Sequence, residues 1–199
     1  MITLYSAAGS CSLAAHICLV ETDLKFKVVK IDLQGDRELP DGRALKELNP
    51  KNQVPVLVLD NQEILTENVA ILQYIADQQP SAKLAPAPTD FARYRLQEWL
   101  GFISSTLHKT LGLLFSPNLA PSTQQLALQR FADSAAYLEQ HFTGYNYLVE
   151  DRFSVADAYL YIVLSWCALF NIDLLPYPKI RAYQARILQR PSVQEVTGA

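Results

Sequence analysis

The sequence predicts an α/β domain followed by an all-α domain, and three observations lead to this prediction. Strand-like and helix-like segments alternate over residues 1–77, whereas every periodic segment after residue 90 has helical spacing. Between them, residues 78–89 contain three prolines among polar and small residues, which is typical of a linker. We therefore expect a first domain over 1–77, a linker over 78–89 and a helical domain over 90–199.

The first domain begins with a short apolar run, Ile2 to Tyr5, which predicts a strand. After a turn of small residues, apolar side chains recur at helical spacing from Leu13 to Val20. The segment from Lys25 to Ile31 then interleaves lysines with apolar residues, as a half-buried strand does. A strand, a helix and a second strand in this order predict a crossover unit whose two strands run parallel.

The rest of the first domain predicts a β-hairpin and a helix. Val54 to Leu59 and Glu63 to Leu65 read as strands, and the Asp and Asn of the turn at Asp60–Gln62 tolerate positive φ. Thr66 is expected to cap a helix that begins near Glu67 and carries an apolar stripe. With a short or irregular helix before the hairpin, the predicted order is βαβ, α, ββα.

The second domain is predicted to be a bundle of helices. Its longer helices are expected over residues 90–114, 122–141, 155–170 and 178–188, and a short helix follows Pro191. The third is the most apolar, but Asp157, Ser165 and several tyrosines interrupt it, so we expect a buried helix and no membrane span. Ser154 and Asp157 at its start match a capping box, a structural feature.

Composition excludes several classes of protein. A chain of 199 residues with 50% hydrophobic and 19% charged residues is not expected to be disordered. The net charge of −3 and the lack of a basic cluster give no reason to expect a nucleic-acid partner. The start lacks the charged region of a secretion signal, and three cysteines without metal-type spacing predict neither a disulfide framework nor a metal site. We therefore expect a cytoplasmic protein.

Four positions could carry chemistry. Cys11 stands where the first turn passes into the first helix, where amides and dipole favour a reactive thiolate, although a free cysteine is often an inert apolar residue. Glu67, at a helix start, is explained first by the helix dipole, and the same geometry could present its carboxylate to a zwitterionic ligand. Pro55 begins an apolar strand, and spacing alone gives no reason to expect a cis bond before it. His108 is a histidine without a partner visible in the sequence.

Further motifs are spread along the chain. They are Gly9 to Ala14 with His16, Asn49 to Pro55, Leu65 to Ile71, Gln73–Tyr74, Glu98 to Leu100, Leu107 to Lys109 and Phe153 to Tyr159. Over essentially the whole chain, these motifs resemble the bacterial beta-class glutathione transferases. The resemblance implies a thioredoxin-like first domain, a helical-bundle second domain and a homodimer.

The resemblance also implies a site for glutathione as co-substrate, without a metal. The residues implied to bind glutathione are Arg37, Gln53, Val54, Pro55, Glu67 and Asn68. Of these, Pro55 is implied to be cis, the Val54 backbone to pair with the cysteinyl part of glutathione, and Glu67 to hold its γ-glutamyl end together with Asn68.

Catalysis is implied to rest on two residues, Cys11 and His108. The start of the first helix lowers the pKa of the glutathione thiol, Cys11 faces its sulfur, and His108 reaches it from the second domain as a hydrogen-bond donor or an acid/base. A hydrophobic electrophile is expected to enter from the helical side. The pocket for it is expected to be lined by Phe102, Leu111 and Phe115, with Tyr5 as a weaker candidate.

Two positions depart from the family pattern, and three functions remain open. Relatives typically carry a lysine where Asp36 stands, so Arg37 is the candidate to hold the glycyl carboxylate, and Gly101 replaces a polar side chain. The expected function is conjugation of glutathione to electrophiles, a detoxification reaction. The alternatives are thiol–disulfide exchange through Cys11 and a non-catalytic binding protein on the same fold.

Overall fold

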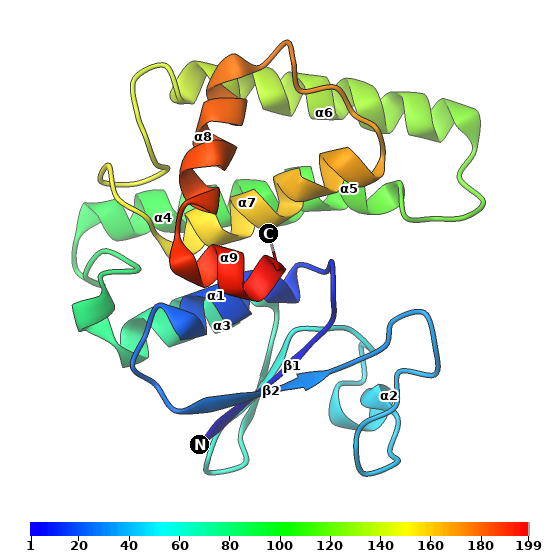
Figure 1. Cartoon of the computed structure of the whole chain (residues 1–199), viewed down its shortest axis with the longest axis vertical. Coiled ribbons are helices and arrows are strands. Elements are labelled where there is room, and N and C mark those ends of the chain that lie inside the picture. Colours follow the sequence, from blue (N-terminus) through cyan, green and yellow to red (C-terminus); the bar gives the residue numbers. More distant parts are fainter. Residues whose placement is uncertain (199) are drawn as a thin grey trace. The chain divides into compact units, whose positions relative to one another are not determined.

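The computed structural model describes residues 1–198 and separates into two compact units (Figure 1). The first unit comprises residues 1–85 together with the C-terminal segment from residue 191, and the second comprises residues 86–190. The C-terminal segment, which the sequence division groups with the helical domain, therefore belongs to the first unit by its contacts.

A mixed four-stranded sheet forms the centre of the first unit. Its strands are β1 (Ile2–Ser6), β2 (Phe26–Lys30), β3 (Val56–Val58) and β4 (Ile64–Thr66). In the order β2-β1-β3-β4, the parallel pair β1–β2 confirms the predicted crossover and the antiparallel pair β3–β4 confirms the predicted hairpin. The antiparallel pairing of β1 with β3 was not predicted. The positive φ in the hairpin turn falls on Gln62 (69°), not on Asp60 or Asn61.

Helices and one 3₁₀ turn complete the first unit. They are α1 (Ser12–Val20), α2 (Leu45–Leu48), α3 (Asn68–Gln78), the 3₁₀ turn η1 (Pro80–Ala82) and α9 (Pro191–Thr197). Helices α1 and α3 pack together on one face (Figure 1). Tyr5 pairs with Val29 and Val56 in the sheet, and these three side chains pack with Leu45 of α2 on the other face.

The C-terminal helix α9 packs against α1. Val193 is fully buried there, and the Ser192 hydroxyl hydrogen bonds to the Glu21 carboxylate at the end of α1. The two partners of this hydrogen bond are 171 residues apart in the chain. The first unit is thus closed by the last segment of the chain.

The expected cap of α3 by Thr66 is wrong. Thr66 is the last residue of β4, and Glu67 occupies the cap position with a φ of 71° and no side-chain cap. The Thr66 hydroxyl instead accepts a hydrogen bond from Lys51 Nζ at 2.8 Å. A sharp turn at Glu67, rather than a capping hydroxyl, therefore starts the helix.

The second unit is helical throughout its regular segments. Its helices are α4 (Phe91–Phe102), α5 (His108–Leu113), α6 (Pro121–His141), α7 (Val155–Leu169) and α8 (Pro178–Leu188). The single helix expected over 90–114 is interrupted by a π-helical segment, η2 (Ile103–Leu107). The hydroxyls of Ser104 and Ser105 donate to the Gly101 carbonyl within this interruption, at 3.2 and 2.8 Å. None of the helices described is long and apolar enough to cross a membrane.

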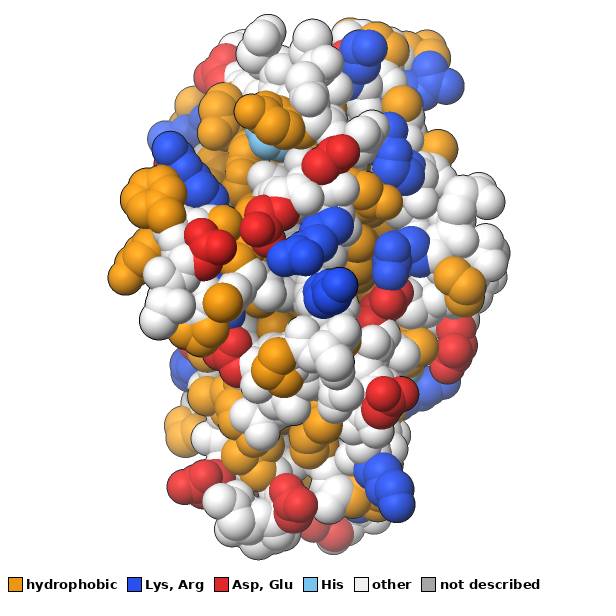
Figure 2. Space-filling view, turned by 90° about the vertical axis from the view of Figure 1, so that its left-hand side faces the viewer, with side chains coloured by type: hydrophobic (Ala, Val, Ile, Leu, Met, Phe, Trp, Pro, Cys, Tyr) orange, Lys and Arg blue, Asp and Glu red, His pale blue; other side chains and the backbone are white. Residues whose placement is uncertain are grey.

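Charges are mixed on the molecular face shown in Figure 2. Basic and acidic side chains alternate there with small groups of apolar side chains, so this face carries no continuous basic surface. The phosphate backbone of a nucleic acid binds to continuous basic surfaces. The mixed charges on this face are consistent with the small net charge of −3.

A buried carboxylate anchors the start of α7. Asp157 accepts hydrogen bonds from the Ser154 backbone N–H (2.9 Å) and hydroxyl (2.7 Å), from the Leu148 N–H (3.0 Å) and from the Tyr183 hydroxyl (3.1 Å). Burial raises the pKa of Asp157 to about 6, and these hydrogen bonds act in the opposite direction. The predicted capping box is therefore part of a larger network that joins α7 to α8.

Replacing this carboxylate tests the network. Asp157→Ala is expected to lower the free energy of unfolding by about 3 kcal/mol or more, because several buried donors lose their acceptor. Asp133→Ala, which removes an exposed carboxylate on α6, is the control and is expected to change it by less than about 0.5 kcal/mol. Urea denaturation measures both, and equal losses would contradict the role assigned to Asp157.

Candidate functional site

Cys11 occupies the cap position of α1, directly after the first turn. Its side chain is 9% exposed, and the thiol donates a long hydrogen bond to the Val54 carbonyl, with a sulfur–oxygen distance of 3.8 Å. The peptide bond between Val54 and Pro55 is cis, as the resemblance implies. The start of α1 and the segment before β3 therefore meet at the Cys11 sulfur.

Three serine hydroxyls hold the loop that carries Cys11. The buried Ser12 hydroxyl lies 2.7 Å from that of Ser6 and 2.5 Å from that of Ser10, and it accepts from the Ala7 N–H at 3.0 Å. Sequence analysis missed this cluster. The two serines flanking Cys11 are the signal that could have found it, because short hydroxyl side chains bond to local backbone.

The Cys11 thiol is protonated at neutral pH. Burial raises the pKa of Cys11 to about 12, the hydrogen bond from its own backbone amide lowers it, and the negative charge of Glu67 raises it further. Only the thiolate is a nucleophile or a redox-active sulfur. In this structure Cys11 is therefore a buried thiol that donates a hydrogen bond.

The start of α3 reaches the same place through Asn68. Its side chain is 7% exposed, and Nδ2 donates to the Cys11 carbonyl at 3.2 Å. Within residues 1–198, the buried Oδ1 of Asn68 has no hydrogen-bond partner. Buried amide oxygens normally have one, so this atom is an unsatisfied acceptor.

Glu67 presents an exposed carboxylate beside this acceptor along the chain. Lys51 Nζ forms an ion pair with Glu67 Oε1, and both side chains lie largely in solvent. The backbone of Glu67 has a positive φ of 71°, a conformation that costs a non-glycine residue about 1–3 kcal/mol and is concentrated at ligand sites.

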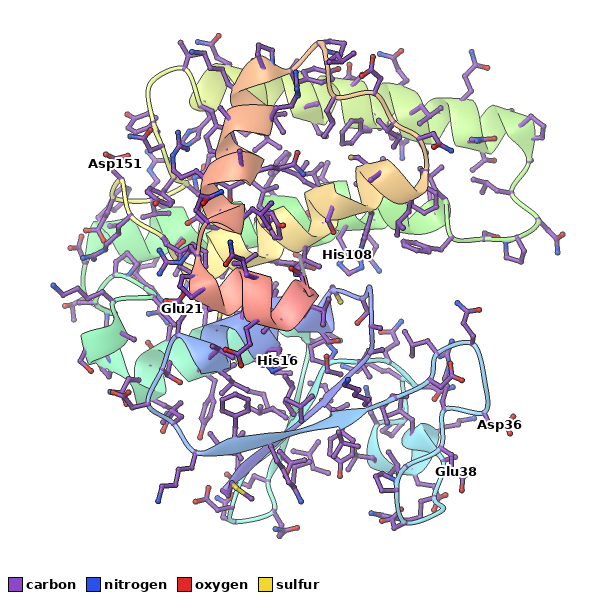
Figure 3. All side chains as sticks on the ribbon, in the orientation of Figure 1. His16, Glu21, Asp36, Glu38, His108 and Asp151 are labelled. Carbon is purple, nitrogen blue, oxygen red and sulfur yellow. The ribbon has the colours of Figure 1, made fainter. Side chains whose placement is uncertain are left out.

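The remaining binding candidates lie on the loops around Val54. Arg37 donates from Nη1 to the Asn52 carbonyl at 2.8 Å, which ties the loop after β2 to the segment before β3. Gln53 has an exposed side chain, and its carbonyl accepts from Asn49 Nδ2. Asp36 is exposed on the loop after β2 (Figure 3).

His108, the other catalytic candidate, belongs to the second unit and begins α5. Its Nδ1 lies 2.6 Å from the Tyr159 hydroxyl of α7, and its ring packs edge-to-face on Trp166 with centroids 4.9 Å apart. Burial lowers the pKa of His108 to about 4, and the positive charge of Lys109 lowers it further. The imidazole is therefore neutral at pH 7.

The residues expected to line the electrophile pocket fall in different places. Phe115 is 50% exposed and packs on Trp166, so it shares a ring cluster with His108. Leu111 is fully buried in the helical unit, and Phe102 packs with Trp99 and Tyr137 in a separate ring cluster. Tyr5 belongs to β1 in the first unit. The contacts of His108 with Tyr159 and Trp166 were not predicted, because no motif in the sequence links either residue to His108.

Family models match most of the chain. The model described as glutathione S-transferase, N-terminal domain, matches residues 1–77, and the model described as glutathione S-transferase, C-terminal domain, matches residues 103–191.

Individual relatives are similar over nearly the full length. The chain is 36% identical to glutathione S-transferase GstA of Escherichia coli O157:H7, covering 98% of this chain and 97% of the relative. A sphingomonad glutathione S-transferase, solved in complex with glutathione, is 41% identical with a TM-score of 0.94. A beta-class glutathione S-transferase from Sphingomonas chungbukensis has the same identity and TM-score. Both structures cover 98% of this chain and are covered to 97% by it.

Alkylation tests the state of Cys11. At pH 7.5, iodoacetamide is expected to modify Cys11 at least about tenfold more slowly than free cysteine, because the reagent needs thiolate and access. Mass spectrometry follows the modification, and urea-unfolded protein, in which all three cysteines should react, is the control. Rapid modification of Cys11 in the folded protein would contradict the buried, protonated thiol.

Titration tests the state of His108. NMR is expected to give a midpoint near pH 4, below the ordinary histidine value of about 6.5, because burial disfavours the imidazolium. Between these two pH values the unfolded chain binds more protons at this group, so the group makes the unfolding free energy rise with pH and fall on acidification. His108→Gln should reduce this dependence of the unfolding free energy on pH. An NMR midpoint at or above pH 6.5 would contradict the lowered pKa of His108.

Proposed function

Because the chain belongs to the glutathione S-transferase family, we propose that it joins the sulfur of glutathione to electrophilic small molecules. The observation that carries this proposal is the meeting of three segments at Cys11 in the first unit. The start of α1, the Val54 backbone and the start of α3 converge there, and Asn68 contributes a buried oxygen without a partner within residues 1–198.

The start of α3 suits the γ-glutamyl end of glutathione. This end carries an ammonium and a carboxylate on one carbon. Asn68 Oδ1 and the Glu67 carboxylate are acceptors for the ammonium, and a helix N-terminus favours the carboxylate. The single zwitterionic end of glutathione therefore supplies both the ammonium and the carboxylate that this helix start suits.

The middle and far end of glutathione are assigned to the loops around Val54. The backbone before β3 can pair with the extended cysteinyl part in the manner of an added strand. Arg37 already donates to the Asn52 carbonyl, and the remaining donors of its guanidinium suit the glycyl carboxylate. Asp36, which stands next to it in the chain, weakens this electrostatic attraction.

Thiol activation is assigned to α1 rather than to a protein nucleophile. The positive end of the α1 dipole stabilises the glutathione thiolate, whose proton leaves to solvent. The thiolate then attacks the electrophilic carbon, a carbon–sulfur bond forms, and the leaving group departs with its electron pair. Cys11 contributes a neutral S–H donor, and neutral His108 contributes a hydrogen bond from its ring.

The protonated Cys11 thiol supports conjugation over thiol–disulfide exchange. Exchange through Cys11 requires its thiolate to attack a disulfide sulfur, and a pKa of about 12 leaves little thiolate at neutral pH. Conjugation requires only the thiolate of glutathione. Half-exposed Phe115 on buried Trp166 supplies an apolar surface for the electrophile.

We expect the enzyme to act as a homodimer in the cytoplasm, as the beta-class resemblance implies. Cys11, Cys18 and Cys167 are all buried, and none of them forms a disulfide within residues 1–198. Exposed Phe91 and Tyr94 on α4 are apolar surface of the kind that subunit contacts cover.

Turnover of a generic aryl halide with glutathione tests the proposed function. Cys11→Ala is expected to retain at least about one third of the wild-type rate, because the cysteine is not the nucleophile. Asn68→Ala is expected to raise the KM for glutathione by about tenfold, because it removes the acceptor for the ammonium. Cys18→Ala, which also replaces a buried cysteine of α1, is the control for changes in packing.

The outcomes separate the alternatives. Turnover that survives Cys11→Ala supports conjugation activated by α1. Absence of turnover together with a Cys11-dependent mixed disulfide with glutathione, detected by mass spectrometry, would replace it with exchange. Absence of both activity and adduct would leave a binding protein on this fold.

A further inference from the structure

The shortest polar contact of His108 comes from a buried tyrosine. The Tyr159 hydroxyl of α7 lies 2.6 Å from His108 Nδ1, and the two rings stand nearly perpendicular at 82°. Tyr159 is 2% exposed, so the helical unit holds this hydroxyl in place. The contact joins two helices through residues 51 positions apart in the chain.

The chemistry of the two groups gives the hydrogen bond its direction. His108 is neutral at pH 7, so one ring nitrogen carries a proton and the other accepts. An imidazole nitrogen is a far stronger base than a phenol oxygen, and a phenol hydroxyl is a good donor. The hydroxyl of Tyr159 therefore donates to Nδ1, which leaves the ring proton on Nε2.

A glycine of the same helix lies beside the His108 ring. Gly112 lies one helical turn after His108, and a side-chain carbon added there would meet His108 Cδ2 at 3.7 Å. Cδ2 is bonded to Nε2, so a side chain at this position would begin in contact with the carbon next to the nitrogen that carries the proton. Because residue 112 is a glycine, no side chain from this turn of α5 covers that part of the ring.

We propose that Tyr159 is a positioning residue that keeps the His108 proton on Nε2, so that His108 serves as a hydrogen-bond donor and not as a base. This inference rests on the proposed function for its role in catalysis. In the transfer reaction the Nε2–H stabilises negative charge on the sulfur or the leaving group, and no proton moves to the imidazole. The base that takes the glutathione proton is then water.

The tautomer can be read without any activity. In protein labelled with ¹⁵N-histidine, long-range ¹H–¹⁵N NMR distinguishes protonated from unprotonated ring nitrogens. His108→Gln identifies the signals among the three histidines. The wild type is expected to show protonated Nε2 and bare Nδ1, and a protonated Nδ1 would overturn the proposal whether or not any variant folds.

A pair of tyrosine variants tests the role of the hydroxyl. Tyr159→Phe is expected to give a mixture of tautomers at His108. Tyr161→Phe is the matched control, because Tyr161 is a buried tyrosine on the same helix and its hydroxyl has no hydrogen-bond partner within residues 1–198. An unchanged tautomer in Tyr159→Phe would overturn the positioning role.

Kinetics then connects the tautomer to the reaction. Tyr159→Phe is expected to lower kcat for the aryl halide by roughly tenfold with an unchanged KM for glutathione, and Tyr161→Phe should lower neither. If Tyr159→Phe and Tyr161→Phe were equally stable to heat and had equal kcat values, the catalytic role proposed for the Tyr159 hydroxyl would be overturned. A wild type that shows the expected tautomer but no turnover would contradict the proposed function and, with it, this catalytic part, while the tautomer assignment stands.

Discussion

The chemistry of the helical unit depends on the buried Asp157 carboxylate. By accepting from Ser154 and Leu148 it sets where α7 begins, and by accepting from Tyr183 it fixes the helix against α8. Tyr159 follows two residues later, so the same anchor determines where its hydroxyl meets His108. A rigid support of this kind allows a single hydrogen bond to favour one tautomer of the His108 imidazole over the other.

The first unit uses burial in a different way. Cys11 has the helix-start position that usually activates a thiol, yet desolvation outweighs the local amide and raises its pKa. The same burial leaves Asn68 Oδ1 without a partner within residues 1–198. Burial therefore keeps the Cys11 sulfur protonated and unreactive. It also leaves an amide oxygen that can accept a hydrogen bond from glutathione, the ligand that we propose.

Local patterns predicted the fold well because periodicity and capping act over a few residues. The parallel β1–β2 pair, the β3–β4 hairpin, most of the helices and the Ser154–Asp157 box follow from such patterns. The Thr66 cap failed because the turn geometry at Glu67 overrode a residue preference. The protonation of Cys11 and the partner of His108 were out of reach, since both depend on segments brought together only by tertiary packing.

The position of α9 bears on how the chain folds as it is synthesised. A ribosome releases the sheet and α1 first, but α9, which covers part of the surface of α1, emerges only after the whole second unit. Throughout that interval the nascent first unit exposes apolar surface, which attracts chaperones and encourages association between incomplete chains. The first unit is therefore completed only after the second unit has been synthesised.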